Sequence, residues 1–258
     1  MRILVTNDDG INAPGLKVLA DIARNLTDDV WIVAPDTNQS GASHSLTLHE
    51  PLRCMEVAEK SFAVRGTPTD CVIMGVRHIL LQSPPDLILS GVNRGSNLAE
   101  DVTYSGTIAG AIEGSLLGIR SLALSQSIDY EAGDIHWETP LIHAPDIVRR
   151  MLETDWNPAV LMNINFPALA PDDVKGVMVT VQGKRDQSLL HIDERFDNWK
   201  QPYYWFNFER RRSNPLEGTD LWAIYQGLIS VSPLTPNLTH LPATEALSGI
   251  FKPRGSTT

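Results

Sequence analysis

Two adjacent carboxylates, Asp8 and Asp9, follow a short apolar run near the start of the chain, in the stretch Val5–Gly15 (VTNDDGINAPG). Like charges side by side repel each other, and one aspartate is enough to form a turn, so a cation or a shared proton is needed to stabilise the pair. Carboxylate oxygens are ligands that hard divalent cations such as Mg²⁺ and Mn²⁺ prefer. The pair therefore indicates a cation site directly after the first strand.

Three further loops are rich in Gly, Ser, Asn and Asp. They are residues 35–43 (PDTNQSGAS), 91–97 (GVNRGSN) and 101–107 (DVTYSGT). Turn formers and helix caps account for any one loop of this composition. Four such loops are harder to explain that way, because loops at the carboxyl edge of a parallel sheet meet where ligands bind. We therefore expect the four loops to converge on one site.

The turn Ser105-Gly106-Thr107 stands at the start of an expected helix. The N–H groups of a first helical turn lack backbone partners and the helix dipole favours negative charge, so this turn is predicted to bind phosphate. A side chain at Gly106 is expected to crowd that phosphate and to leave cation binding nearly intact. A cation beside a phosphate indicates phosphoryl chemistry.

Other motifs for similar chemistry are absent from the sequence. The chain has no G-x-x-x-x-G-K-[ST] of P-loop proteins, no G-x-G-x-x-G after a strand and no G-x-S-x-G elbow of α/β-hydrolases. Phosphatases that form an aspartyl-phosphate place two aspartates two positions apart after the first strand. Asp8 and Asp9 are adjacent, which makes that class the weaker alternative.

The elements that must position these loops alternate along the first half of the chain. Short apolar runs typical of buried parallel strands are separated by helix-like segments, which predicts an α/β fold with a doubly wound, mainly parallel, Rossmann-like sheet. The strands are expected at Arg2–Thr6, Val30–Ala34, Asp86–Ser90 and Ser121–Ser125. The helices are expected at 14–26 with Asn12 as cap, at Thr67–Leu81 with Thr69 as cap, and at Thr107–Leu117.

Beyond residue 125 the pattern is looser. A helix is expected to end over Ile147–Leu152, with Pro145 at its start or at a kink, and further strands are expected at Val160–Phe166, Gly176–Val181 and Asp220–Tyr225. Residues 252–258 read as a frayed polar tail. We divide the chain into an α/β core over 1–181, an extended C-terminal arm over 182–218, and a strand and tail over 219–258 that return to the core.

Composition excludes several classes of protein. A net charge of −10 argues against general binding to nucleic acid or anionic membranes, which requires a basic surface. No apolar run approaches the ~20 residues of a membrane span, and the first ten residues lack the pattern of a signal peptide. The two cysteines, Cys54 and Cys71, are too few for a disulfide framework and are expected to be buried. We expect a soluble cytoplasmic protein.

The loops resemble those of the SurE family, the survival-protein-E nucleotidases that remove phosphate from nucleoside monophosphates. The matching stretches span nearly the whole chain: NDDGINAPG from Asn7, VAPDTNQSGASHSLTL from Val33, GTPTDCV from Gly66, SGVNRGSNLAEDVTYSGTIAGAIEG from Ser90 and GLISVSPLTPNLT from Gly227. The resemblance implies a SurE-like fold and a metal-dependent 5'-nucleotidase, with 3'-monophosphates as a second substrate class to test.

The same resemblance implies roles for particular residues. One divalent cation per subunit, Mg²⁺ or Mn²⁺, is expected on Asp8, Asp9, Ser40 and Asn93, and the phosphate on Asn97 and the turn Ser105, Gly106 and Thr107. We expect a metal-bound water to attack phosphorus and Asp9 to orient or deprotonate it. His44 is a candidate contact to the phosphate or the leaving group, against the alternative of a solvated loop histidine. Arg94 either attracts the anionic substrate or is a solvated loop arginine.

Two alternatives to the nucleotidase remain open from the sequence. One is a nucleotide-binding or sensing module without turnover, which the presence of all four implied metal ligands disfavours. The other is the aspartyl-phosphate phosphatase, in which Asp8 or Asp9 would carry a covalent phosphate.

The segment 182–218 contains the aromatic stretch Tyr203–Phe208 followed by Arg210–Arg212. Aromatic residues beside a basic run can bind single-stranded nucleic acid by stacking. The segment has seven Lys and Arg against six Asp and Glu, so it is nearly neutral and that interpretation is disfavoured. Apolar side chains on both faces of an exposed strand indicate burial against another subunit. The family resemblance implies an arm exchanged between the subunits of a dimer or tetramer.

Overall fold

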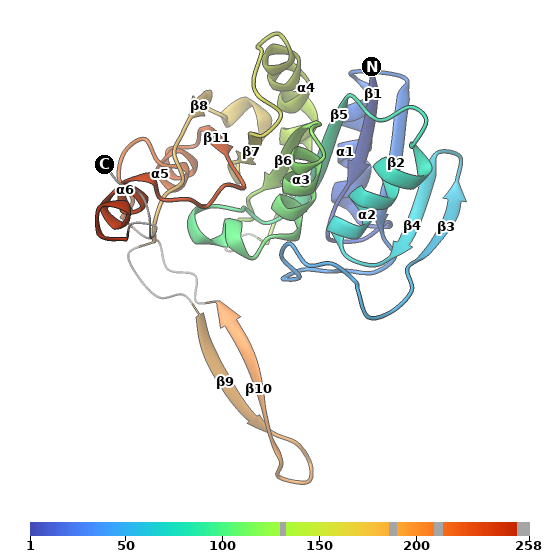
Figure 1. Cartoon of the computed structure of the whole chain (residues 1–258). Helices are drawn as coiled ribbons and strands as arrows, with labels where there is room; N and C mark the ends of the chain where they lie inside the picture. The colour runs from blue at the N-terminus through green and yellow to red at the C-terminus, as the bar shows by residue number, and fades with distance from the viewer. Residues whose placement is uncertain (130–132, 186–189, 209–213, 252–258) are drawn as a thin grey trace.

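The computed structural model describes residues 1–129, 133–185, 190–208 and 214–251. Within these residues the centre is a nine-stranded, mostly parallel sheet with helices on both faces (Figure 1), which confirms the predicted doubly wound α/β fold. The strands lie in the order β3-β4-β2-β1-β5-β6-β7-β11-β8. Their bounds are β1 (Arg2–Thr6), β2 (Asp29–Pro35), β3 (Arg53–Ala58), β4 (Ser61–Arg65), β5 (Leu87–Arg94), β6 (Arg120–Gln126), β7 (Leu161–Phe166), β8 (Val177–Val179) and β11 (Ile229–Leu234).

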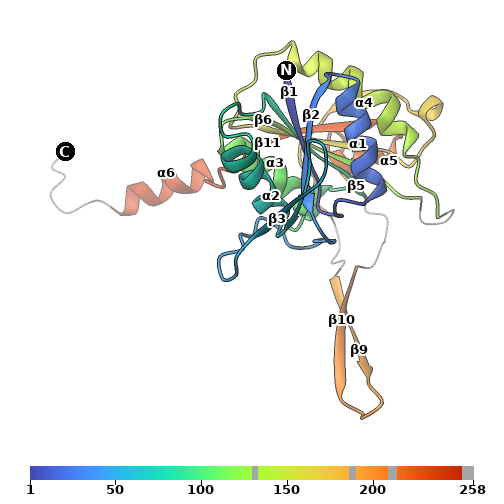
Figure 2. The same ribbon diagram turned by 90° about the vertical axis from the view of Figure 1, so that its right-hand side faces the viewer.

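The helices form a layer on each face of the sheet. α1 (Pro14–Arg24) and α4 (Glu138–Leu152) cover one face, and α2 (Pro68–Met74) and α3 (Gly106–Leu116) cover the other (Figure 2). The remaining helices are the π-helical continuation of α2 (Gly75–Ile79), two 3-10 turns (Ala99–Thr103 and Pro171–Asp173), α5 (Asp220–Tyr225) and α6 (Leu241–Ile250). None of the described helices combines the length and the apolar composition needed to cross a bilayer.

Strand β1 shows why the centre of the sheet is rigid. Its alternate residues point to opposite layers, as the period of a strand requires, so Ile3 and Val5 join the cluster under α1 and Leu4 joins the cluster under α2. All three side chains are fully buried, which stabilises the fold by about 2 kcal/mol each. The loop that follows β1 therefore leaves from a well-packed strand.

The strand order reverses at β1, which determines where a ligand can bind. From β1 the sheet continues through β2, β4 and β3 on one side and through β5, β6 and β7 on the other. Loops that leave β1 and β5 therefore diverge at the carboxyl edge and open a crevice between them. Asp8 follows β1 and Asn93 lies near the end of β5, so both are at this crevice.

Several local predictions were wrong. The segment Asp220–Tyr225 is a helix rather than a strand, because Thr219 caps it and a short apolar run alone does not distinguish the two. The antiparallel pair of β3 and β4 was not predicted, nor was α6.

The caps and one cysteine also differ from prediction. Thr67 rather than Thr69 caps α2, through a reciprocal pair of hydrogen bonds with Asp70, and the residue before α1 is Ala13 rather than Asn12. Cys71 is buried, but Cys54 lies on the edge strand β3 and is exposed. Pro145 lies inside α4, which begins seven residues earlier at Glu138.

An antiparallel hairpin of β9 (Leu190–Phe196) and β10 (Pro202–Phe208) stands away from the core (Figure 1). The aromatic side chains of Tyr203–Phe206 are exposed, with Trp205 at 56% and Phe206 at 72% of their full accessible surface. The predicted aromatic strand is therefore present and uncovered. Arg210–Arg212 and the polar tail 252–258 lie outside the described residues. Helix α6 also projects from the core (Figure 2).

Candidate active site

Asp8 is the buried centre of the site. The Asn7 side chain brackets the loop, since its amide donates to the Gly10 carbonyl at 3.0 Å and its oxygen accepts from the Gly10 N–H at 3.2 Å. Asp8 is only 4% exposed, and its Oδ1 accepts a hydrogen bond from the Thr107 hydroxyl at 2.6 Å. Burial raises the pKa of Asp8 to about 6, with a smaller contribution from the charge of Asp9. Within the described residues no Lys, Arg or His forms an ion pair with this carboxylate.

Asp9 joins two further loops to the first. Its Oδ1 accepts from the Asn38 side-chain amide at 3.4 Å and its Oδ2 from the Arg94 N–H at 3.3 Å. Burial raises the pKa of Asp9, whereas Arg94 lowers it. The backbone carbonyl of Asp8 also accepts from the Gln39 N–H at 2.7 Å. The four loops predicted to converge are therefore joined by hydrogen bonds that involve Asp8 and Asp9.

Ser40 and Asn93 bring oxygen atoms to the same cavity. Ser40 is held in its loop by a hydrogen bond from its N–H to the Asn38 Oδ1 at 2.8 Å. The Asn93 side-chain amide donates to the Gly95 carbonyl at 2.8 Å, which orients the amide and leaves its oxygen as the available atom. Both residues line the cavity that Asp8 lines.

The donor set fits a hard divalent cation. Two carboxylates, a hydroxyl and an amide oxygen are the ligand types that Mg²⁺ and Mn²⁺ prefer. Asp8 is a buried carboxylate with one hydroxyl donor and no ionic partner in the described part of the chain, and a cation would supply the missing charge. No group of three or more His, Cys, Asp and Glu side chains that could hold a metal occurs among the described residues. The predicted site has two carboxylates, so its remaining metal ligands would be neutral oxygen atoms.

Asn97 is buried at the edge of the cavity, and its side chain, N–H and carbonyl all form hydrogen bonds. Its side-chain amide donates to the Ser125 hydroxyl at 2.8 Å, and its backbone N–H donates to the Asn165 Oδ1 at 2.8 Å. Its carbonyl accepts from the side chains of Asn163 at 2.9 Å and Asn165 at 3.2 Å. This network makes Asn97 a rigid group on the cavity wall rather than a mobile loop residue.

The turn at the start of α3 binds Asp8 and also contributes Ser105 to the cavity lining. The Ser105 hydroxyl caps the helix by accepting from the Ile108 N–H at 3.1 Å, and the Thr107 hydroxyl is committed to Asp8. Among the described residues, the N–H groups of Gly106 and Thr107 have no hydrogen-bond acceptor. At this helix start, the backbone groups rather than the two hydroxyls are therefore the donors that lack a partner.

Gly106 is required for a reason that the sequence did not reveal. A Cβ at this position would lie 2.7 Å from the Asp8 Cβ and 3.0 Å from its Oδ2. Such contacts are too close for any real side chain, so a substitution would displace Asp8. The expectation that a side chain here would spare cation binding stays a prediction, and the packing of the helix start directly on the carboxylate argues against it.

The cavity of about 1040 Å³ extends beyond the predicted residues. We call the part formed by the predicted loops the N-terminal wall, which comprises Asp8, Ser40, Asn93, Asn97 and Ser105. Another part, the C-terminal wall, comprises Leu169, Lys175, Arg185, Leu221, Ile224, Tyr225 and Gln226. Sequence reasoning missed the second wall. The cap signal of Thr219 before Asp220 is the feature that could have placed α5 there.

Of the two further candidates for substrate contact, Arg94 lines the cavity and His44 is not among the lining residues. The His44 ring lies 3.0 Å from a carboxylate oxygen of Glu113 on α3, so it links its loop to that helix. Arg94 lines the cavity, and its backbone N–H binds Asp9.

Comparisons with known proteins agree on one family. The family described as Survival protein SurE matches residues 3–189. The chain is 57% identical over 254 residues to the 5'-nucleotidase SurE of Methylobacterium nodulans, covering 97% of this chain and 100% of that protein. It is 56% identical over 253 residues to the 5'-nucleotidase SurE of Caulobacter vibrioides, covering 97% and 96%. The crystal structure of the SurE protein from Aquifex aeolicus superimposes with a TM-score of 0.85 at 39% identity, covering 97% and 99%.

Proposed function

Because this chain belongs to the SurE survival-protein family, we propose that it is a metal-dependent 5'-nucleotidase that hydrolyses nucleoside 5'-monophosphates to nucleoside and phosphate. The names of its relatives support the reaction, and one observation in the molecule supports the metal. Asp8 is a buried carboxylate beside a second carboxylate, at the crevice of the sheet, with no ionic partner in the described chain.

The proposed cofactor is one divalent cation per subunit, Mg²⁺ or Mn²⁺, held by Asp8, Asp9, Ser40 and Asn93. When bound, such a cation supplies positive charge that stabilises the transferring phosphoryl group and acidifies a water molecule. Thr107 holds Asp8 in place through its hydroxyl. Because Gly106 has no side chain, the start of α3 can pack directly against the Asp8 carboxylate.

We assign the phosphate to the free backbone N–H groups at the start of α3 and to Asn97. The N–H groups of Gly106 and Thr107 would bind the phosphate oxygens, and the helix dipole adds favourable charge. Asn97, held by β7, would keep its position as the substrate enters. In this scheme water would attack phosphorus as the bond from phosphorus to the ribose oxygen breaks, its proton would pass to a carboxylate oxygen of Asp9, and the ribose oxygen would take up a proton to give the nucleoside. Asp9 lies next to Asp8, which places its carboxylate within reach of a water at the cation site.

Phosphate release from a panel of nucleoside 5'- and 3'-monophosphates tests this function. The purified protein is stripped with a chelator and then assayed with Mg²⁺, Mn²⁺ or no metal. We expect release from 5'-monophosphates only when metal is present. Binding without release would support the nucleotide-sensing alternative. Acid quenching during turnover would reveal a covalent phosphate on Asp8 or Asp9 if the protein were an aspartyl-phosphate phosphatase.

We also propose that the chain forms a dimer or tetramer through the segment 182–218, with 1–181 and 219–258 building the core. The support is the exposed aromatic surface of the hairpin. Trp205 and Phe206 lie on opposite faces of β10, and both are exposed in the single chain. Burial of such side chains against a second subunit would remove apolar surface from water on both faces.

A further inference from the structure

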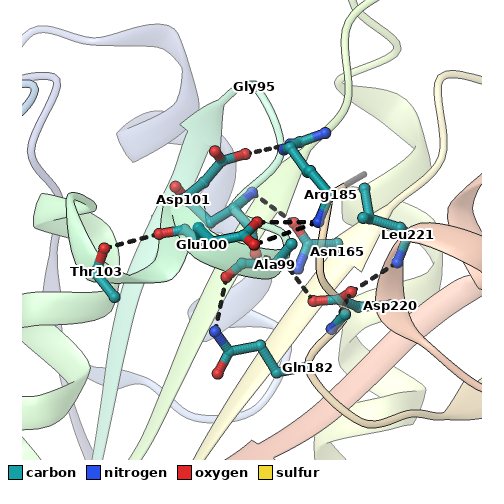
Figure 3. Close-up of polar contacts among 12 residues, drawn as sticks. Gly95, Ala99, Glu100, Asp101, Thr103, Asn165, Gln182, Arg185, Asp220 and Leu221 are labelled. Atoms are coloured by element: carbon teal, nitrogen blue, oxygen red, sulfur yellow. Dashed lines mark hydrogen bonds and ion pairs between the residues drawn. The ribbon is translucent and has the colours of Figure 1, made fainter. Parts of the chain in front are cut away.

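The stretch that begins at Asn97 and ends at Asp101 is held at Ala99, Glu100 and Asp101 by residues from the distant C-terminal part of the chain (Figure 3). At its centre, Ala99 has a φ of 51°, in the left-handed region that residues other than glycine seldom adopt. Its N–H donates to Asp220 Oδ2 at 2.9 Å, and its carbonyl accepts from the Gln182 side-chain amide at 2.9 Å. Both backbone polar groups of Ala99 are therefore bound by residues 121 and 83 positions away.

Asp220 is a fully buried carboxylate held by backbone amides. Besides the Ala99 N–H, it accepts hydrogen bonds from the N–H groups of Gly183 at 2.8 Å and Leu221 at 2.7 Å. Burial raises the pKa of Asp220, whereas these three donors lower it. Hydrogen bonds to a buried charge are stronger than those between neutral groups, so this carboxylate connects three segments firmly.

Capping of α5 does not explain Asp220. The cap of that helix is Thr219, whose hydroxyl accepts from the Trp222 N–H at 3.4 Å. Two of the three bonds to Asp220 come from outside the helix, one from the cavity loop and one from the segment before the hairpin. The carboxylate therefore joins separate parts of the chain.

Further contacts hold the same stretch. The Arg185 N–H approaches both carboxylate oxygens of Glu100 at 3.3 and 3.2 Å, and its guanidinium donates to Asp101 Oδ2 at 2.5 Å (Figure 3). Leu98 and Ala99 pack with Leu221 in a small buried cluster. The stretch is thus fixed by polar and apolar contacts from one direction.

The stretch matters to the cavity because of what lies at its start. Asn97, two residues before Ala99, is held on its other side by Asn163 and Asn165 of β7. If Ala99 relaxed out of its left-handed conformation, the chain direction after Asn97 would change. The position of Asn97 therefore depends on both anchors.

We propose that Asp220 and Gln182 are positioning residues for the phosphate end of the site, because they hold Ala99 in the conformation that presents Asn97 to the substrate. This inference rests on the proposed function. Neither residue contacts Asp8 or Asp9, so the two anchors act on phosphate affinity and not on the cation ligands.

Asp220→Asn tests the proposal against Thr219→Ala, which removes the cap of the same helix without touching Ala99. Asp220→Asn should raise the KM for a nucleoside 5'-monophosphate and the inhibition constant of inorganic phosphate. We expect a change of about tenfold, because the substitution removes one hydrogen bond to a charged group. Its kcat and its Mn²⁺ affinity by calorimetry should stay within about threefold, since the cation ligands are untouched. Thr219→Ala should lower the melting temperature only.

Gln182→Ala is a second variant, at a solvent-exposed side chain whose loss spares the buried carboxylate. It should raise the same two constants about threefold, since a hydrogen bond between neutral groups contributes less. Hydrogen exchange of peptides over 95–104 should be faster in both anchor variants than in Thr219→Ala. That measurement requires no turnover, so it separates failure of this proposal from failure of the proposed function. Equal exchange in all three variants, or unchanged phosphate inhibition in both anchor variants, would overturn the proposal.

Discussion

The two walls of the cavity differ in the elements that carry their residues. On the N-terminal wall, Asp8 and Asn93 lie at the ends of two neighbouring strands. On the C-terminal wall, the residues lie on α5, in the segment after β7 and in the segment before the hairpin, and the bond between Gln182 and Ala99 joins that last segment to the loop after β5. The first wall carries the groups suited to the reaction, and the second can shape what binds beside them. Variants on the two walls should therefore change different measured constants.

The largest effect is expected for Asp8→Asn on the N-terminal wall. Loss of one carboxylate from the cation site should lower kcat on the order of a thousandfold, as for other groups that stabilise transition-state charge. Folding should persist, because the amide keeps the volume of the buried side chain. Phosphate release and Mn²⁺ calorimetry provide the measurements. Asp21→Asn, which removes a surface carboxylate on α1, is the control. Wild-type turnover in Asp8→Asn would contradict the metal assignment.

The raised pKa of Asp8 predicts how stability changes with pH in the absence of metal. The folded-state pKa of about 6 exceeds the ordinary value of 3.8, so the group favours the folded state when protonated. Its contribution is complete below about pH 4 and is lost as pH rises through 6, a change of roughly 3 kcal/mol in the free energy of unfolding. Denaturant titrations with a chelator should show this loss in the wild type and not in Asp8→Asn. Identical pH profiles would contradict the prediction.

Gly106→Ala should weaken both cation binding and phosphate binding at the N-terminal wall. The new Cβ would displace Asp8, so Mn²⁺ affinity and inhibition by phosphate should both weaken, by roughly tenfold to a hundredfold. Ser105→Ala provides the contrast, because it removes a helix cap worth about 1 kcal/mol without intruding on Asp8. Calorimetry on both variants distinguishes the two cases. Unchanged metal affinity in Gly106→Ala would mean that the loop adapts to the added methyl group.

An apolar change on the C-terminal wall that leaves the contacts to Ala99 intact should affect the nucleoside and not the phosphate. Leu169→Ala removes an apolar side chain from the cavity lining, and we expect about a fivefold increase in the KM for nucleoside 5'-monophosphates. Inhibition by inorganic phosphate should not change, because the Leu169 side chain has no group that hydrogen-bonds to phosphate. Parallel measurement of the two constants tests the division. If both constants shifted together, the two walls would not be separable.

The smallest effect on turnover is expected from removal of the hairpin. Replacing residues 190–208 with a short Gly/Ser turn retains Arg185 and its contacts to Glu100 and Asp101. Because no described residue of the hairpin lines the cavity, kcat should stay within about twofold. The mass measured by light scattering should fall. An unchanged mass would exclude the hairpin as the assembly element, and binding of single-stranded nucleic acid would then be the property to test.

The sequence predicted the strands and the loops that leave them because those signals are local. Arg2–Thr6 shows the apolar run of a buried strand, and the residues proposed to bind metal lie within a few positions of strand ends. Asp220 was missed for the opposite reason. Its helix is only six residues long, and its main partner, Ala99, lies 121 positions away. No local pattern carries such a contact.

The sequence by itself thus determined the fold class and which loops carry oxygen donors. Only the tertiary structure decided how those donors are used. The Thr107 hydroxyl binds Asp8, Gly106 packs against that carboxylate, and Asn97 is held by β7. The physical reason is the distance along the chain over which each kind of signal acts. Apolar periodicity and turn chemistry act over a few residues, whereas these contacts depend on how strands and helices distant in the chain pack together.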